Sequence, residues 1–446
     1  MGLFEVQIIA EGLKDLRALN KLDLDLKHRA SRQEGRNRFV VPGILKTEEI
    51  KKAESFGYEV NIIDDLSEML DARMREVSPE NRFLTARNIP DMEIRSVEGY
   101  LTADEVEEAV VNLSSQIPDL VEIIELPHRT WEGRVSHAVR MGSSLKSDRT
   151  TILFTGSMHA REWGGADICV SFLINLIKAY QEGNILQYGG KVFSVDQVRS
   201  IIDHLNIIVF PDVNPDGRHY SQTVYPMWRK NRNPNIALDP ENPGVDLNRN
   251  FDFLWQSGIG TSTDPSSNTY KGEHPFSEPE IKNVLHLFDT YPGIAYYVDI
   301  HSYSELILYS WGDDDNQSVN PEQNFANPAY DGERGILEDM TYREFISPAD
   351  EIIASGLANR MNDALAAVRG GRGYSVQASS GLYPTTATSS DYAFSRSFMA
   401  ANKAKIHGWT IEFGKEFIPP FSEMRKIIKE VGAAMTELCW DVSTSL

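Results

Sequence analysis

Cysteine is nearly absent from this chain, with only two among 446 residues, so a disulfide framework is not indicated. Blocks of lysine and arginine are also missing. The formal charge of −21 argues against nucleic acid and anionic membrane surfaces as partners, because both reward clustered positive charge. The longest apolar run, at 166–177, contains Asp167 and Asn175 and is too short to span a bilayer. We therefore expect a soluble protein in which this run is a buried helix.

The N-terminus lacks the features of a secretory signal peptide. It begins MGLFEVQIIA, with no basic start, no long apolar segment and no small-residue cleavage site. From this feature alone, the protein either stays in the cytosol or has lost a signal peptide from the present sequence.

The spacing of apolar residues predicts two α/β domains joined by a linker. Residues 1–77 alternate strand-like runs, such as FEVQIIA and YEVNIID, with helix-like runs, which indicates a small α/β domain. Residues 78–96 are polar and irregular and contain Pro79 and Pro90, as expected of a linker. The remainder, residues 97–446, is long enough for one large α/β domain.

Helices and strands alternate in the larger domain. Thr102 is followed by Glu105 at the spacing of a capping box, so we expect a helix to begin there. Residues 164–180 and 278–290 also have a helical pattern. The runs with the pattern of strands are VEIIELP, SHAVRMG, TTILFTG, LNIIVFP and AYYVDIH. This alternation predicts a mixed, mostly parallel sheet between helices.

Polar residues follow three of these strands, at the edge where such sheets carry their chemistry. TTILFTG leads to His159 and Glu162, LNIIVFP leads to DVNPDGR, and AYYVDIH ends on His301. Taken singly, each histidine is more simply explained as a hydrogen-bonded core residue or a surface pair. Two histidines and a glutamate that leave one position open for water are, however, the ligand set of a catalytic zinc. Together they predict a zinc site.

Eight motifs in a fixed order resemble those of the zinc metallocarboxypeptidases of the pancreatic carboxypeptidase A/B type. They are GSMHARE, NPDG, WRK, GVDLNRNF, SEPE, DIHSYS, LYPTTATSSDYAF and WTIEFG, and they lie within residues 97–440. The resemblance implies an eight-stranded sheet between helices, one zinc per chain and removal of one C-terminal residue from a peptide. Its implied partners are peptide or protein C-termini, bound by a monomer that contacts neither nucleic acid nor a membrane.

The resemblance also assigns roles in catalysis. The implied zinc ligands are His159, Glu162 and His301. Glu412 in TIEFG resembles the general base, which takes a proton from water activated by the metal and later gives it to the leaving amine. Arg229 in MWRK resembles the residue that faces the negative charge of the transition state. Asp246 in GVD resembles the acceptor that fixes the tautomer of His159.

Further residues resemble the family's substrate-binding groups. Arg249 and Asn248 in LNRN resemble a clamp for the free carboxylate of the substrate, a task that suits the planar fork of arginine. Tyr383 in GLYP resembles the mobile phenol that closes over this clamp. Arg161 and Tyr303 match positions that line the substrate groove. An exopeptidase needs such a clamp because it must recognise a free chain end.

Counting along LYPTTATSSDYAF, the resemblance places Ser390 at the floor of the pocket that receives the departing side chain. A small neutral floor predicts the release of neutral residues, because a buried basic group without a counter-charge is costly. The expected walls are Thr385, Thr388 and Thr410. Asp313–Asp315 in WGDDDNQ follow near the same pocket, and one of them could instead accept a basic side chain.

Residues 1–77 resemble, more weakly, the family's activation segment, a small open-sandwich α/β domain. Arg95 lies just before SVEGYLTADEV, which resembles the start of the mature enzymes and so predicts a cleavage point. A fused binding domain would have the same periodicity. If the segment is inhibitory, the protein is a zymogen, and the family's habit of exporting zymogens then predicts secretion.

Two other functions stay open. A peptide-binding relative could keep the fold without catalysis, although such a protein would be expected to have lost a ligand or the base, and neither is missing here. A zinc amidohydrolase that acts on acylated amino acids or peptidoglycan peptides would use the same metal chemistry. The intact set of Asn248, Arg249 and Tyr383 favours free C-termini instead.

Overall fold

The chain forms two compact units in the computed structural model, Met1–Arg75 and Glu76–Leu446. The structure describes residues 2–19, 22, 24–26, 31–77, 81–83, 99–144, 149–236, 243–336 and 341–445. The predicted linker at 78–96 lies outside the described residues except for 81–83, and the predicted cleavage point at Arg95 lies outside them too.

The first unit is a four-stranded antiparallel sheet in the order β2-β3-β1-β4. Its elements are β1 (Leu3–Glu11), α1 (Leu13–Leu19), β2 (Arg32–Glu34), β3 (Arg38–Lys46), α2 (Thr47–Ser55), β4 (Glu59–Asp65) and α3 (Ser67–Arg75). Val6 and Ile8 of β1 point to the same face, because strand side chains alternate, and pack in one core with Ile50 and Ala53 of α2. The unit therefore has a hydrophobic core of its own.

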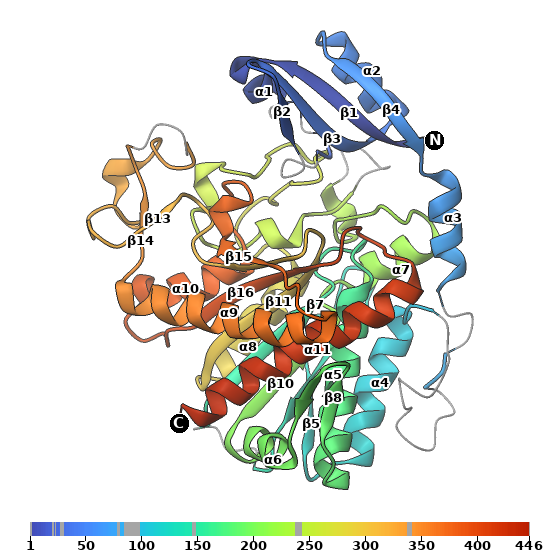
Figure 1. Cartoon of the computed structure of the whole chain (residues 1–446), viewed down its shortest axis with the longest axis vertical. Coiled ribbons are helices and arrows are strands. Elements are labelled where there is room, and N and C mark those ends of the chain that lie inside the picture. Colours follow the sequence, from blue (N-terminus) through green and yellow to red (C-terminus); the bar gives the residue numbers. More distant parts are fainter. Residues whose placement is uncertain are drawn as a thin grey trace. The chain divides into compact units, whose positions relative to one another are not determined.

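The second unit contains an eight-stranded sheet in the order β15-β12-β16-β11-β7-β10-β6-β5 (Figure 1). Its helices of eight or more residues are α4 (Ala103–Gln116), α5 (Gly164–Glu182), α6 (Val195–His204), α7 (Pro215–Thr223), α8 (Pro279–Thr290), α9 (Pro348–Arg369), α10 (Ser389–Met399) and α11 (Phe421–Thr444). The strands of this sheet are β5 (Val121–Glu125), β6 (His137–Met141), β7 (Thr151–Gly156), β10 (Asn206–Phe210), β11 (Ile294–Ser302), β12 (Leu306–Tyr309), β15 (Ser375–Ala378) and β16 (His407–Phe413).

Four pairs of neighbouring strands in this sheet are parallel: β7 with β10, β7 with β11, β11 with β16 and β12 with β15. The remaining pairs, β12 with β16, β10 with β6 and β6 with β5, are antiparallel. Two small ribbons lie outside the sheet, β8 (Leu186–Tyr188) with β9 (Lys191–Phe193) and β13 (Asn316–Gln317) with β14 (Glu344–Phe345). The mixed, mostly parallel sheet predicted from the sequence is confirmed.

Helices cover both faces of the sheet. Leu153 of β7 shares a core cluster with Val284 of α8, whereas Phe154 packs on Phe172 of α5 with ring centroids 5.3 Å apart. Because successive strand residues point to opposite faces, α5 and α8 lie on opposite sides. α11 packs against α5, α6 and α9, and Figure 1 shows α9 and α11 side by side in front of the sheet. α10 contributes Ala393 to the α8 cluster on the other side.

Local signals in the sequence explain several of these elements. Thr102 and Glu105 form the predicted capping box: the Thr102 hydroxyl accepts from the Glu105 N–H at 3.1 Å, and the Glu105 carboxylate accepts from the Thr102 N–H at 3.0 Å. The apolar run at 166–177 lies in buried α5, as predicted. Its Asp167 is tolerated there because it pairs with the equally buried Arg218 at 3.0 Å.

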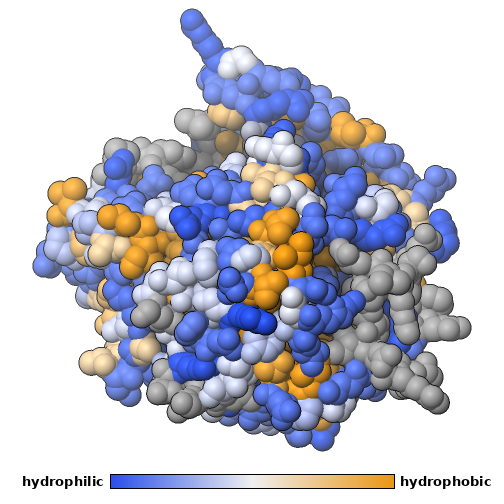
Figure 2. Space-filling view, turned by 60° about the horizontal axis from the view of Figure 1, so that its bottom comes forward, coloured by the Kyte–Doolittle hydropathy of each residue, from blue (hydrophilic) through white to orange (hydrophobic). Residues whose placement is uncertain are grey.

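Within the described residues, the structure contains no helix long and apolar enough to cross a bilayer. The face shown in Figure 2 is mostly hydrophilic, with hydrophobic residues gathered in separate patches.

Candidate active site

The three candidate ligands lie at one edge of the sheet, where neighbouring strands end. His159 and Glu162 belong to the turn that connects β7 to α5, and His301 is the penultimate residue of β11, which pairs with β7 in parallel. Glu412 of β16 lies directly opposite His301 in the parallel register of β11 and β16. The strands thus bring together residues that are up to 253 positions apart, from 159 to 412.

Small residues allow the turn after β7 to form. Ser157 has φ of 56°, and its hydroxyl accepts a hydrogen bond from the Ala166 N–H at 3.0 Å. A Cβ on Gly165 would lie 2.8 Å from the Ser157 nitrogen and 3.2 Å from the Ile300 oxygen. The absence of a side chain at Gly165 therefore lets α5 begin directly against the ends of β7 and β11, beside the candidate ligands.

His159, Glu162 and His301 converge on one point. The Glu162 carboxylate lies 2.8 Å from His159 Nδ1 through one oxygen and 2.9 Å from His301 Nδ1 through the other. The two Nδ1 atoms are 3.1 Å apart, and all three side chains are buried. Burial would raise the pKa of Glu162, but the two imidazoles hold it well below its usual range. Two imidazole nitrogens and one anionic oxygen at this separation fit a zinc ion.

A carboxylate anchors the far side of each imidazole. Asp246 Oδ1 lies 3.1 Å from His159 Nε2, and Asp299 Oδ2 lies 2.8 Å from His301 Nε2. Both contacts leave Nδ1 directed at the common point, which is how outer carboxylates orient metal-binding histidines. Asp246 is among the predicted residues, whereas Asp299 is not. Its position two residues before His301 on the same strand was the available signal, because such residues share a face.

Arg229 shares Asp246 with His159. Its Nε and Nη2 donate to Asp246 Oδ2 at 3.0 and 2.8 Å, while Nη1 lies 4.0 Å from Glu162. Burial disfavours the charged forms of Asp246 and Arg229, but the attraction between their opposite charges favours them. As a result the pKa of Asp246 is well below its usual range and that of Arg229 is raised. The guanidinium is therefore fixed beside the ligands, with one nitrogen facing them.

Glu412 is half-buried beside the ligands. Burial, reinforced by the Glu162 carboxylate and opposed by His301 and Arg229, raises its pKa to about 8. A divalent cation at the three ligands would act in the opposite direction and favour the carboxylate. The pKa of Glu412 therefore depends on whether a metal ion is bound at the three ligands. A pKa shifted in this way is typical of a group that transfers protons.

Two nitrogens of Arg249 donate to backbone oxygens, and the third, Nη2, faces the Tyr383 hydroxyl. Its Nε donates to the Gly260 oxygen at 2.8 Å and its Nη1 to the Asn248 oxygen at 2.7 Å. Nη2 lies 3.2 Å from the Tyr383 hydroxyl, so the expected clamp arginine and the expected mobile phenol are in contact. The Asn248 side chain instead accepts from the Ser389 N–H at 2.8 Å, which ties it to the start of α10.

The family model for zinc carboxypeptidases matches residues 106–434, a range that includes all the candidate active-site residues named in this section. The chain belongs to the zinc carboxypeptidase family. The predicted family is therefore confirmed, and family membership together with the convergent ligands implies zinc as the metal.

Named relatives resemble part of this chain. Metallocarboxypeptidase A of Trichophyton tonsurans is 38% identical over 190 residues, which cover 41% of this chain and 41% of the relative. Carboxypeptidase A1 of Rattus norvegicus is 28% identical over 309 residues, or 67% of each chain. The chain thus spans less than half the length of the fungal relatives that it matches.

Solved structures confirm the fold. The carboxypeptidase A from Helicoverpa armigera superposes with a TM-score of 0.73 at 19% identity, over 100% of this chain and 98% of that one. The thrombin-activatable fibrinolysis inhibitor superposes with a TM-score of 0.70 at 19% identity, over 100% of both chains. At this identity the likeness concerns the fold alone.

The two residues expected to line the substrate groove meet at one aromatic ring. The guanidinium carbon of Arg161 lies 3.8 Å from the centroid of the Phe417 ring, a cation–π contact. Tyr303 packs edge-on against the same ring, with centroids 4.7 Å apart. Phe417 is absent from the predicted set, because nothing in the sequence around it distinguishes it from a core aromatic residue.

Ser390 is buried at the start of α10, where its hydroxyl lies 3.4 Å from that of Thr410. The next residue, Asp391, accepts a hydrogen bond from Thr388 at 3.0 Å, and burial raises its pKa to about 6. A Cβ on Gly312 would lie 2.6 Å from the Asp391 carboxylate. The segment that precedes Asp313 therefore packs against Asp391, next to the expected pocket floor.

Asp313 and Asp314 are buried, and Asp313 is close to a second carboxylate. Burial and the neighbouring Glu344 raise the pKa of Asp313 well above its usual range, and burial raises that of Glu344 to about 7. Glu344 was not predicted, because it comes from the separate ribbon strand β14. The acidic segment thus approaches Asp391 beside Ser390, and burial disfavours the charged forms of both Asp313 and Glu344.

Residues that follow β10 do not join the ligands, although the sequence suggested chemistry there. Asn214 caps α7 by accepting from the Gly217 N–H at 3.0 Å. Asp216 accepts from Thr130 at 2.9 Å. Asp212 lines a separate cavity.

Proposed function

We propose that the chain is a zinc-dependent carboxypeptidase that hydrolyses the last peptide bond of a peptide and releases one residue. The observation that carries this proposal is the position of the Arg249–Tyr383 pair in the domain that also holds His159, Glu162 and His301. The metal ligands alone would suit several hydrolases. A fixed guanidinium with one available nitrogen adds recognition of a free carboxylate.

Each residue has a distinct task in this proposal. Bound zinc would acidify a water molecule and polarise the scissile carbonyl. Glu412 takes the proton from the attacking water and delivers it to the leaving amine. Arg229 stabilises the negative charge that develops on the carbonyl oxygen, through the nitrogen that Asp246 does not use. Asp246 and Asp299 hold the two imidazoles in the orientation that metal binding needs.

The substrate carboxylate would take the place of the Tyr383 hydroxyl on Arg249 Nη2. The other two nitrogen positions already donate to backbone oxygens and keep the fork in place. The phenol would then be free to close over the bound chain end. Asn248 remains a predicted contact of the substrate, although its oxygen is engaged by Ser389. Arg161 and Tyr303 would line the path along which the peptide enters.

Blocked dipeptides with a free or an amidated C-terminus test this function. We expect the wild-type protein to cleave the free acid and to leave the amide nearly intact. Arg249→Ala should lower kcat/KM for the free acid by roughly 30-fold or more, because truncating one partner of a buried charged hydrogen bond costs about 2–5 kcal/mol. The amide should be affected much less. Arg425→Ala, at an exposed position of α11, is the matched control and should leave the preference unchanged.

Other outcomes of this assay would favour the competing functions. Hydrolysis of neither dipeptide, with saturable binding of the free acid, would indicate a peptide-binding protein. Cleavage of acylated amino acids or peptidoglycan peptides without preference for a free carboxylate would indicate an amidohydrolase. An unchanged acid-to-amide ratio in Arg249→Ala would show that another residue binds the chain end.

We also propose that residues 1–77 are an inhibitory activation segment, followed by a cleavable linker at 78–96 and the catalytic domain at 97–446. The separate hydrophobic core of the first unit supports a domain that can be removed. Cleavage near Arg95 by limited proteolysis is expected to raise peptidase activity, and the isolated segment should lower it again. Arg95→Gln should resist cleavage at that position. Unchanged activity after complete cleavage would favour a fused binding domain and remove the main support for secretion.

A further inference from the structure

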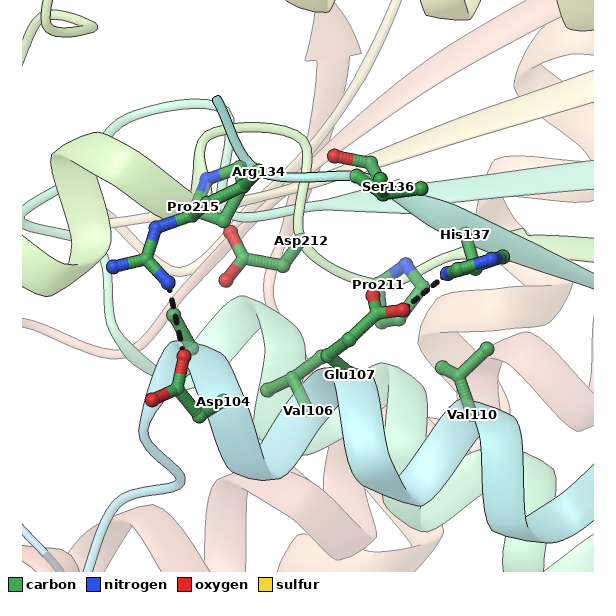
Figure 3. Close-up of a pocket in the computed structure, with 12 residues that line it drawn as sticks. Asp104, Val106, Glu107, Val110, Arg134, Ser136, His137, Pro211, Asp212 and Pro215 are labelled. Carbon is green, nitrogen blue, oxygen red and sulfur yellow. Dashed lines mark hydrogen bonds and ion pairs between the residues drawn. The ribbon is translucent and has the colours of Figure 1, made fainter. Parts of the chain in front are cut away.

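A cavity lies within the second unit, away from the predicted active-site residues. It has a volume of about 190 Å³ and is formed by the start of α4, the segment that enters β6 and the loop after β10 (Figure 3). The zinc ligands, the proposed base and the proposed clamp are not among its lining residues. Its walls are apolar where Val106 and Val110 of α4 face Pro211 and Pro215. Its polar groups come from Asp104, Glu107, Arg134, Ser136 and Asp212.

Asp212 is the unusual group in this cavity. Its side chain is only 6% exposed, yet neither carboxylate oxygen accepts a hydrogen bond of normal geometry from a described residue, although the Asn214 backbone N–H is near enough to lower its pKa. The nearest charge, Arg218 Nε, lies 3.9 Å away, beyond hydrogen-bonding distance. Ser136, which is 4% exposed, also has a buried hydroxyl without a partner among the described residues. A buried polar group without a hydrogen-bond partner destabilises the fold, so these two acceptors favour a bound group that can donate hydrogen bonds to them.

The neighbouring cations are already committed to other acids. Arg218 is paired with Asp167 at 3.0 Å and also donates to the Trp163 oxygen at 2.6 Å. Arg134 contacts Asp104 at 2.9 Å and Asp216 at 3.1 Å. His137 is paired with Glu107, as the dashed line in Figure 3 marks. Arg218 and Arg134 thus have closer acidic partners than Asp212, whose own contact with Arg218 is 3.9 Å long.

The geometry argues for an organic cation and against a metal or an anion. Among the described residues, only the three active-site ligands bring their donor atoms close enough together for a metal ion. An anion would meet the carboxylates of Asp212, Glu107 and Asp104. A compact cation with a short apolar body would instead place its N–H donors on Asp212 and Ser136 and its carbon atoms against the valines and prolines.

We propose that this cavity binds a primary alkylammonium or an alkylguanidinium group, either as a free small molecule or as the basic side chain of a second polypeptide. The carboxylate of Asp212 supplies the charge, and the Ser136 hydroxyl supplies a further acceptor. This site does not depend on the metal or on the proposed peptidase activity.

The protonation of Asp212 gives the proposal a second readout. Burial raises its pKa to about 7, with Arg218 and Arg134 acting against this shift. Only the ionised form attracts a cation, so affinity should rise as the pH passes from below to above about 7. His137, whose pKa is raised by Glu107, acts in the same direction, because its protonation at low pH would make the surroundings more positive.

Calorimetric titration of the full chain with n-butylammonium and ethylguanidinium tests the proposal, and 1-butanol serves as the uncharged probe. We expect saturable binding of both cations, no binding of the alcohol, and a Kd at least about tenfold weaker in Asp212→Asn. Asp119→Asn, at an exposed position, is the matched control and should bind as the wild type does. Ser136→Ala should weaken binding to a smaller extent and serves as the readout if Asp212→Asn fails to fold.

A short peptide with one central lysine, titrated in the Glu412→Gln background to prevent hydrolysis, distinguishes the two sources of the cation. Binding of the free cations supports a small molecule, whereas Asp212-dependent binding of the peptide alone supports a basic side chain. The proposal is overturned if no probe binds saturably, or if the wild-type protein and the Asp212 and Ser136 variants bind the probes equally.

Discussion

Glu412→Gln is expected to lower kcat by about 10²–10⁴-fold while the protein keeps its fold and its zinc. The glutamine side chain has nearly the same shape but cannot accept a proton from the attacking water. KM should change little, because the proposed clamp at Arg249 is untouched. The measurement is steady-state hydrolysis of a blocked dipeptide, together with the zinc content of the same preparation by elemental analysis.

His301→Ala provides the contrast for this result. It removes one of the three ligands, so we expect loss of both tight zinc binding and activity, and a chelator should produce the same loss in the wild-type protein. Only the glutamine variant should separate chemistry from metal content. Activity of Glu412→Gln within tenfold of the wild type would assign proton transfer to another residue, and full activity of metal-free protein would end the zinc mechanism.

Two neighbouring strands of the sheet, β7 and β10, could be predicted because each is a short, fully buried apolar run. β7 and β10 are buried along their whole length, so their sequences are continuous apolar segments that end in turn residues. Helix α4 was predictable from its capping box. The order of strands in the sheet could not be derived from such patterns, and the expected eight-stranded architecture came from the family resemblance.

Other elements are invisible to periodicity for physical reasons. Helix α11 is buried on almost all sides from Glu430 to Ser443, so its apolar residues form no single stripe. Strands β12 and β15 have only four residues each and are defined by their partners. A pattern read from one segment cannot reveal a strand that exists because of its neighbour.

The same limit applies to the site. His159, Glu162 and His301 could be grouped because each follows an apolar strand, but Asp299 and Glu344 act through contacts that only the folded chain makes. Asp212 illustrates the opposite error. It follows a buried strand just as the ligands do, yet its carboxylate lines a separate cavity, because the chain turns toward α4 after β10. A position at the end of a strand therefore indicates that a residue could be functional, but it does not show to which site the residue belongs.

The preference for the departing residue is expected to change when the pocket floor is given a charge. We propose that the wild-type protein releases neutral residues, because Ser390 and Thr410 offer hydroxyl groups and no counter-charge. Ser390→Asp should raise the ratio of kcat/KM for peptides ending in Arg or Lys over those ending in Phe or Leu by roughly 100-fold, since a close buried charge pair is worth several kcal/mol. Ser390→Asn, which has the same size without the charge, should leave the ratio near that of the wild type.

Substituting the buried acids beside Ser390 tests whether they, and not Ser390, set the preference for the departing residue. Burial raises the pKa values of Asp313 and Glu344, which disfavours their charged forms, and Asp391 is engaged by Thr388. A lysine that entered the pocket would have to ionise this pair at the cost of its own desolvation. Asp313→Asn should therefore leave the neutral preference intact. If the wild-type protein instead cleaves C-terminal Arg efficiently and Asp313→Asn abolishes that cleavage, the acidic segment sets the specificity and Ser390 only makes room for the side chain.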